Sequence, residues 1–227
     1  FLPQFDYEGE LYIGIQDALP PQQLSLLFQM AEGSADPNLE PQSIQWSYLS
    51  GNRWLPIDDG LLLQDTTRGL INSGIVSFAL NRLDSIQANT LLPNDLYWLR
   101  ATIPRHTNSV ADTIGIHAQA VSATFIDQGN APDHLRQSLP AESITRMVNR
   151  LAGVGSVRQP YASQDGQMAE DDRTFYTRVS ERLRHKHRAL TIWDYEHLVL
   201  ERFPEIYKAK AIPVSPGHVE MIVIPNI

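Results

Sequence analysis

The chain of 227 residues contains no cysteine, which excludes both a disulfide framework and a thiolate metal site. No apolar run approaches the length of a membrane span, so we expect no membrane-spanning segment. The first residues, Phe1-Leu2-Pro3-Gln4, resemble neither a signal peptide nor an initiator start. We therefore expect an internal segment of a longer protein, with further sequence on both sides.

Patterns typical of catalysis are also missing. The sequence has neither an HExxH nor a GxSxG motif, and Gly153-Val154-Gly155 is too short for a phosphate-binding loop. His185 and His187 are two residues apart and would diverge on a helix. Asp58-Asp59 precedes a glycine in a predicted turn, and Asp171-Asp172 opens a predicted helix. We expect no enzyme activity, no metal, no cofactor and no small-molecule substrate.

Charge is distributed unevenly along the chain. Residues 1–140 contain six arginines, no lysine and fifteen acidic residues, whereas residues 141–227 contain twelve basic and eleven acidic residues. The positive charge is concentrated between Arg173 and Arg188, which indicates either a domain boundary or complementary faces that meet. The basic segment is either a solvated helix face or a contact with an acidic neighbouring protein. Nucleic acid is disfavoured, because the chain is acidic overall and the segment lacks interleaved aromatic residues that could stack on bases.

The part before Pro140 is rich in short runs with strand character. Turn-forming residues separate these runs, and few helical patterns are visible among them, so we predict an antiparallel β-sandwich or a jelly roll. The predicted strands are Glu10–Gln16, Gln23–Ala31, Ser43–Leu49, Ile75–Leu80, Leu96–Ile103 and Ile114–Phe125. The fold class is therefore α+β, with a sandwich domain at residues 1–130, a connector at 131–140 and a smaller α+β domain at 141–227.

The smaller domain is predicted to run helix, helix, strand, strand. Glu142–Leu151 is predicted as a short helix or a strand-like entry. The next helix has an apolar stripe and is followed by a second helix, with Thr191 as its N-cap and Asp194 at the third helical position. Pro204 ends that helix, because it cannot continue the backbone hydrogen bonds. The runs Ile206–Val214 and His218–Ile224 flank the turn residues Ser215-Pro216-Gly217 and predict a hairpin whose second strand is covered on most of its surface.

Two sets of side chains in this domain are predicted to carry its role. The first set is a structural core that holds the two helices to the sheet: Phe175, Val179, Leu183, Trp193 and Phe203. The second set is a candidate subunit interface on the basic segment: Arg178, Arg182, Arg184, Lys186 and Arg188.

The amino-acid sequence of this region resembles the baseplate J-like family. The resemblance covers residues 144–224 and rests on the acidic run Glu170-Asp171-Asp172, the RLRHKHRALT string, WDYE at Trp193–Glu196, FPE at Phe203–Glu205 and the Pro-Gly hairpin. Gln164-Asp165-Gly166 stands where a double glycine is common in the family. Upstream, LYIGI at Leu11–Ile15 and the run Trp46–Trp54 are similar to the β-rich part of injection-system members.

This resemblance implies a wedge protein of a contractile phage tail or a related injection system. Copies of the full protein would assemble as a ring around a central hub, in contact with other baseplate subunits and sheath-proximal proteins. Rearrangement of that ring would be coupled to sheath contraction. The particle would be made and assembled in the bacterial cytoplasm before any release.

An alternative is a glycan-binding module of a tail-associated adhesin. Its basis is a set of aromatic residues in the β-rich half that could stack against sugar rings: Trp46, Tyr48, Trp54, Tyr97 and Trp98. Trp46 and Tyr48 lie two residues apart and share one strand face, which favours core packing over sugar binding.

Overall fold

A computed structural model describes residues 6–18, 21–58, 60–80, 87–186, 188–203, 206–215 and 217–225. The chain divides into two compact units, Phe1–Thr124 and Phe125–Ile227.

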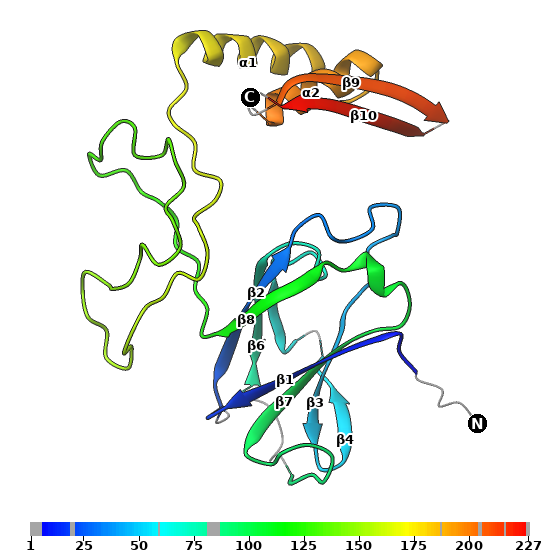
Figure 1. The fold of residues 1–227 in the computed structure, drawn as a ribbon, viewed down its shortest axis with the longest axis vertical. Helices are drawn as coiled ribbons and strands as arrows, with labels where there is room; N and C mark the ends of the chain where they lie inside the picture. Colours follow the sequence, from blue (N-terminus) through cyan, green and yellow to red (C-terminus); the bar gives the residue numbers. More distant parts are fainter. Residues whose placement is uncertain are drawn as a thin grey trace. The chain divides into compact units, whose positions relative to one another are not determined.

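The first unit is a sandwich of two four-stranded antiparallel sheets (Figure 1). In one sheet the strand order is β1 (Gly9–Gln16), β7 (Leu96–Ile103), β3 (Gln45–Ser50) and β4 (Arg53–Pro56). In the other the order is β5 (Leu62–Asp65), β6 (Gly74–Ala79), β2 (Gln23–Ala31) and β8 (Asp112–Ala118). A short 3-10 helix, η2 (Thr107–Ser109), lies between β7 and β8.

Alternating side chains of both sheets form the core of this unit. On β2 every second residue is buried, namely Leu24, Leu26, Phe28 and Met30, as expected for a strand with one face on a core. Trp46 of the opposite sheet packs edge-on against Phe28 and Phe78, with ring centroids 5.9 Å and 5.0 Å away. The predicted α+β class with an antiparallel sandwich is confirmed.

The strand predictions differ from the structure mainly at the ends of the sandwich. Strands β2 and β7 have the predicted bounds, whereas the four-residue strands β4 and β5 were not predicted. The strand predicted at Ile114–Phe125 is wrong beyond Ala118, where β8 ends. Gln119 has a φ of 57°, in the left-handed region, so the extended backbone cannot continue through it.

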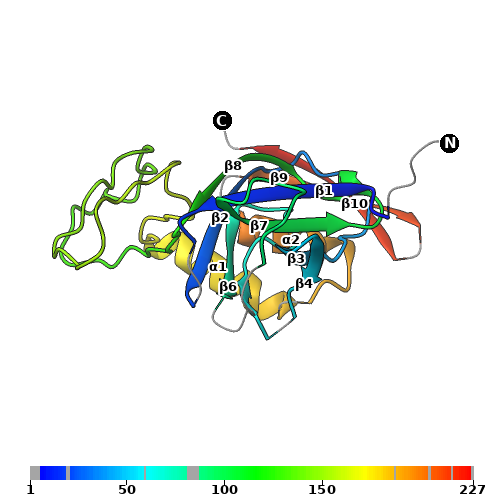
Figure 2. The same cartoon turned by 90° about the horizontal axis from the view of Figure 1, so that it is seen from below.

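Residues 119–171 contain neither helix nor strand, and both views draw them as open loops (Figures 1 and 2). The prediction of a helix or strand at Glu142–Leu151 is therefore wrong. Glu142 has a φ of 64°, and its backbone N–H donates to the Gln159 carbonyl at 2.9 Å. The chain is thus turned into a loop at the position where the predicted element would begin.

The second unit ends in two helices and a hairpin, as predicted: α1 (Asp172–His185), α2 (Ile192–Arg202), β9 (Ile206–Ser215) and β10 (His218–Pro225). The predicted cap is confirmed: the Thr191 hydroxyl accepts from the Asp194 N–H at 3.2 Å, and the Asp194 carboxylate accepts from the Thr191 N–H at 2.7 Å. Pro204, Pro216 and His187 lie outside the described residues.

Candidate subunit-contact surface

Arg178 on α1 is held by a carboxylate of its own chain. Its Nε and Nη2 atoms donate to the two carboxylate oxygens of Glu170 at 2.6 Å and 2.7 Å. Its guanidinium also lies 5.6 Å from the Phe175 ring centroid. The hydrogen bond from Arg178 lowers the pKa of Glu170, so this carboxylate stays ionised at neutral pH. Arg178 therefore joins the start of α1 to the segment before it.

The other four predicted interface residues are exposed but do not share one helix face. Arg182 lies one turn after Arg178, whereas Arg184 lies two residues further on and projects from a different side. Helix α1 ends at His185, and Lys186 has a φ of 48°. Arg188 follows beyond the helix end. The basic residues therefore surround the C-terminal end of α1, where the helix dipole favours positive charge.

The five residues predicted as a structural core are not buried within the described chain. Four of them are largely exposed to solvent: Phe175 is 43% exposed, Leu183 71%, Trp193 37% and Phe203 45%. Val179 is half-buried. The stripe on α1 has the spacing of a buried face, but no described element covers it fully. Trp193 instead stacks on His197 of its own helix, with ring centroids 3.7 Å apart.

Small side chains, rather than these large ones, make the tightest contact of the module. Ala209 and Ala211 of β9 are 5% and 3% exposed, and β9 packs against α2. Glu196 of α2 accepts from the Ala211 N–H at 3.1 Å and pairs with Lys210 Nζ at 2.9 Å. These two bonds lower the pKa of Glu196. Because the Ala211 N–H points to Glu196, this position on the outer edge of β9 is not free to pair with another strand.

The other face of the hairpin carries exposed aliphatic residues beside the exposed charged residues Lys208, Lys210 and Glu220. In the register of the hairpin, Ile222 lies opposite Lys210 and Ile224 lies opposite Lys208, on the face away from the two buried alanines. Four aliphatic residues on it are exposed to solvent: Ile212 is 40% exposed, Val214 60%, Ile222 53% and Ile224 49%. We refer to these four residues as the aliphatic hairpin face. The prediction that the second strand is covered on most of its surface is therefore wrong for the described chain.

Three of the five aromatic residues behind the glycan-binding alternative lie in the core of the sandwich, whereas Trp54 and Trp98 are half-buried. Trp46, Tyr48 and Tyr97 are only 6%, 7% and 6% exposed, so their rings belong to the core. The half-buried Trp54 ring has the Arg100 guanidinium 4.7 Å from its centroid and the Tyr12 ring at 5.5 Å. The burial of Trp46, Tyr48 and Tyr97 agrees with the expectation that these rings pack in the core.

Among the described residues no group of three His, Asp or Glu side chains could hold a metal ion. Among the same residues, no helix is long and apolar enough to cross a membrane. The surface described above presents exposed aliphatic, aromatic and arginine side chains, which are residue types enriched at protein interfaces.

A β-sandwich joined to a small α+β module with exposed apolar side chains is compatible with a structural protein that contacts other proteins. The family model described as "Baseplate protein PVC11-like" matches residues 3–226. The chain therefore belongs to this family of baseplate proteins of contractile injection systems. A search among curated proteins gave no match.

Membership in this family assigns a structural baseplate role, in contact with other baseplate components of a phage-tail-like particle. A structural role is consistent with the expectation that the chain is not an enzyme.

Proposed function

We propose that this chain is part of a wedge subunit, in which the α1–α2–hairpin module makes the contacts that join neighbouring subunits into a ring. Rearrangement of these contacts would couple the baseplate to sheath contraction. The observation that carries the proposal is the aliphatic hairpin face, which a folded module leaves open to solvent although its residues are typical of a protein interior.

The α1 helix offers a second part of the same contact. Phe175 and Leu183 lie on its apolar stripe, and Arg182 is exposed one turn after Arg178. Exposed apolar side chains bordered by arginine are typical of protein interfaces, because arginine pairs with carboxylates and also covers apolar surface. The residues first predicted as an internal core are, in this proposal, buried by a neighbouring subunit. Arg184, Lys186 and Arg188 contribute polar contacts at its rim.

Charge reversal at the end of α1 tests the proposal. The double variant R182E/R188E is introduced into the full-length protein and expressed with the other baseplate components. Arg178 is left unchanged, because its ion pair with Glu170 is internal to the chain. We expect loss of co-purifying subunits and of intact particles, since a like-charge contact at an interface rim weakens association.

The matched control is R53E/R105E, which reverses two exposed arginines of the sandwich unit. Both variants should keep the unfolding free energy of the parent chain within about 0.5 kcal/mol, as surface substitutions usually do. Normal particle yield and unchanged subunit contacts for R182E/R188E would contradict the proposed interface.

A further inference from the structure

The segment between the sandwich and α1 contains a loop that is closed at its neck. The Gln159 carbonyl accepts from the Glu142 N–H at 2.9 Å, and its side-chain Oε1 accepts from the Ile144 N–H at 3.1 Å. Arg158 Nε donates to Glu142 Oε1 at 2.6 Å. These bonds bring the two ends of residues 143–158 together, which is the geometry of an Ω-loop. We refer to residues 143–158 as the clasped loop.

The clasped loop is aliphatic and basic. Four of its apolar side chains retain large exposures: Ile144 43%, Val148 101%, Leu151 61% and Val154 45%. No acidic residue occurs between Glu142 and Asp165. Arg146 and Arg150 are exposed and form no ion pair with another described residue. Hydrogen bonds close the neck of this loop, yet four of its aliphatic side chains stay exposed to water. This combination is typical of a binding element.

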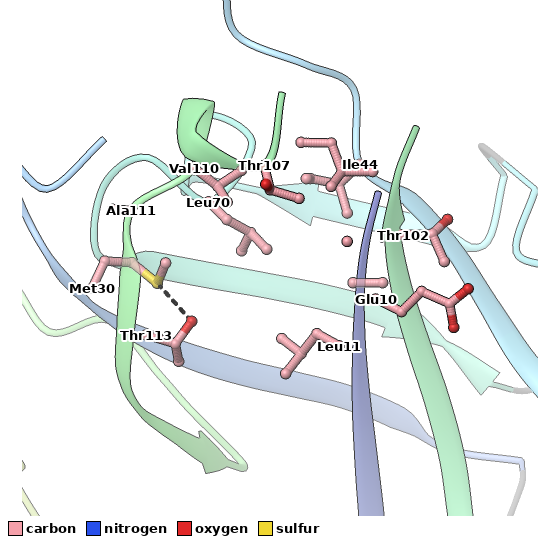
Figure 3. Close-up of a pocket in the computed structure, with 13 residues that line it drawn as sticks. Glu10, Leu11, Met30, Ile44, Leu70, Thr102, Thr107, Val110, Ala111 and Thr113 are labelled. Carbon is pink, nitrogen blue, oxygen red and sulfur yellow. Dashed lines mark hydrogen bonds between the residues drawn. The ribbon is translucent and has the colours of Figure 1, made fainter. Parts of the chain in front are cut away.

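The sandwich unit has an apolar cleft with complementary properties. The cleft lies between the edge strands β1 and β8 and has a volume of about 190 Å³. Figure 3 shows Leu11, Met30 and Leu70 around it, together with Val110. An apolar cavity of about 150 Å³ is large enough to admit a benzene ring. This cleft therefore has room for one or two aliphatic side chains.

Carboxylates border the cleft. The carboxylate of the lining residue Glu10 is already paired with Arg100, whose Nη1 lies 3.7 Å from its Oε1. Glu8 precedes the lining residue Gly9 and accepts from the Thr107 hydroxyl at 3.0 Å. A backbone bond from His106 lowers the pKa of Glu8, so its carboxylate stays charged. Asp112 is exposed next to the cleft, between the lining residues Ala111 and Thr113. Residues 1–124 as a whole carry thirteen acidic side chains against five arginines.

We propose that the clasped loop of one copy inserts its aliphatic tip into the cleft of a second copy. Val148 and Leu151 enter the apolar space, while Arg146 and Arg150 meet the carboxylates at its border. The two surfaces match in both respects that decide such a contact, because each is apolar at its centre and their charges are of opposite sign. The contact is head-to-tail, so repetition of it generates a ring or a filament. This contact uses none of the α1 or hairpin residues. A test that contradicts it therefore leaves the wedge contact proposed above unaffected, and the reverse also holds.

Cross-linking between two versions of the cysteine-free chain tests this contact directly. One version carries V148C at the loop tip, and the other, with a larger tag, carries T113C at the cleft. After mixing and treatment with a short bismaleimide, we expect a mixed-size heterodimer. The matched control replaces T113C with A118C, which is also exposed on β8 but does not line the cleft. A heterodimer yield no higher with T113C than with A118C would overturn the proposal, and so would V148C chains that cross-link only to each other.

A second variant distinguishes insertion from chance encounter. Leu151→Asp is added to the V148C chain, at a side chain that is 61% exposed and whose change should leave the fold intact. We expect heterodimer formation to slow by about tenfold or more, because the loss of one buried leucine is worth at least that factor in affinity. The control Leu63→Asp changes a leucine of similar exposure, 51%, outside the loop and should have no effect. Equal cross-linking of the two variants would refute insertion of the loop tip.

Discussion

Matched leucine-to-alanine changes at Leu99 and Leu183 separate a true core position from one that only has the sequence pattern of a core. Leu99 on β7 is 0% exposed, whereas Leu183 on α1 is 71% exposed. Both changes remove the same atoms. The difference in their effects therefore reports the surroundings of each side chain.

The magnitude follows from burial. Removal of three buried carbons from Leu99 costs about 2.4 kcal/mol in transfer free energy, at about 0.8 kcal/mol per carbon. The cavity left in the closed sandwich raises the total to about 3–4 kcal/mol. At Leu183 less than a third of the side chain is covered, so the transfer loss is about 0.7 kcal/mol. No closed cavity forms there, and the higher helix propensity of alanine offsets a few tenths of a kcal/mol. We expect a net change at Leu183 within about 0.5 kcal/mol.

Hydrogen exchange measured by mass spectrometry at increasing urea concentrations suits this chain, because it reports β7 and α1 separately although the two lie in different units. Leu99→Ala should lower the urea midpoint of β7 by about 1 M or more. Leu183→Ala should leave the midpoint of α1 almost unchanged. A loss above about 2 kcal/mol at Leu183 would show that this side chain is buried within the free chain, and the reasoning from exposure would then be refuted.

Two further predictions concern the α2 module. Thr191→Ala should destabilise α2 by about 1 kcal/mol, because it removes the side-chain acceptor of the cap. In urea unfolding, Thr191→Ser should keep most of the stability that Thr191→Ala loses. Equal stability of the two variants would contradict the role of the cap. The folded-state pKa of Glu196 is lowered by Lys210 and by the Ala211 N–H, so its contribution is present above the ordinary glutamate pKa and is lost as pH falls through the lower folded value. Glu196→Gln should therefore reduce the loss of α2 protection as the pH falls below the ordinary glutamate pKa, and an unchanged pH profile would contradict this assignment.

Local signals in the sequence were sufficient for much of the fold. The cap at Thr191 and Asp194 and the bounds of β2 were all predictable, because each depends on residues that are neighbours in the chain. The strand expected beyond Ala118 was wrong although residues 121–126 are rich in strand-forming types. The backbone at Gln119 turns into the left-handed region there, and residue type alone does not reveal such a change.

The candidate contact surface was predictable only in part. The sequence located the arginines of α1, but it did not reveal that Arg178 is paired internally with Glu170. The aliphatic hairpin face was missed, because an apolar strand predicts burial without saying which element provides it. The acidic side chains next to the cleft were also not predictable, since Glu8 and Asp112 lie far apart in the chain.

The sequence by itself determined the order of the two helices and the hairpin, the capping of α2 and the absence of cysteine chemistry, because these depend on residue types and on short-range backbone bonds. Only the tertiary structure decided which apolar residues are core. Leu99 and Leu183 are the same residue type, yet one lies between two sheets and the other faces solvent. Burial depends on whether a second surface covers the side chain, and that surface is supplied by distant parts of the chain or, as we propose for α1 and the hairpin, by another subunit.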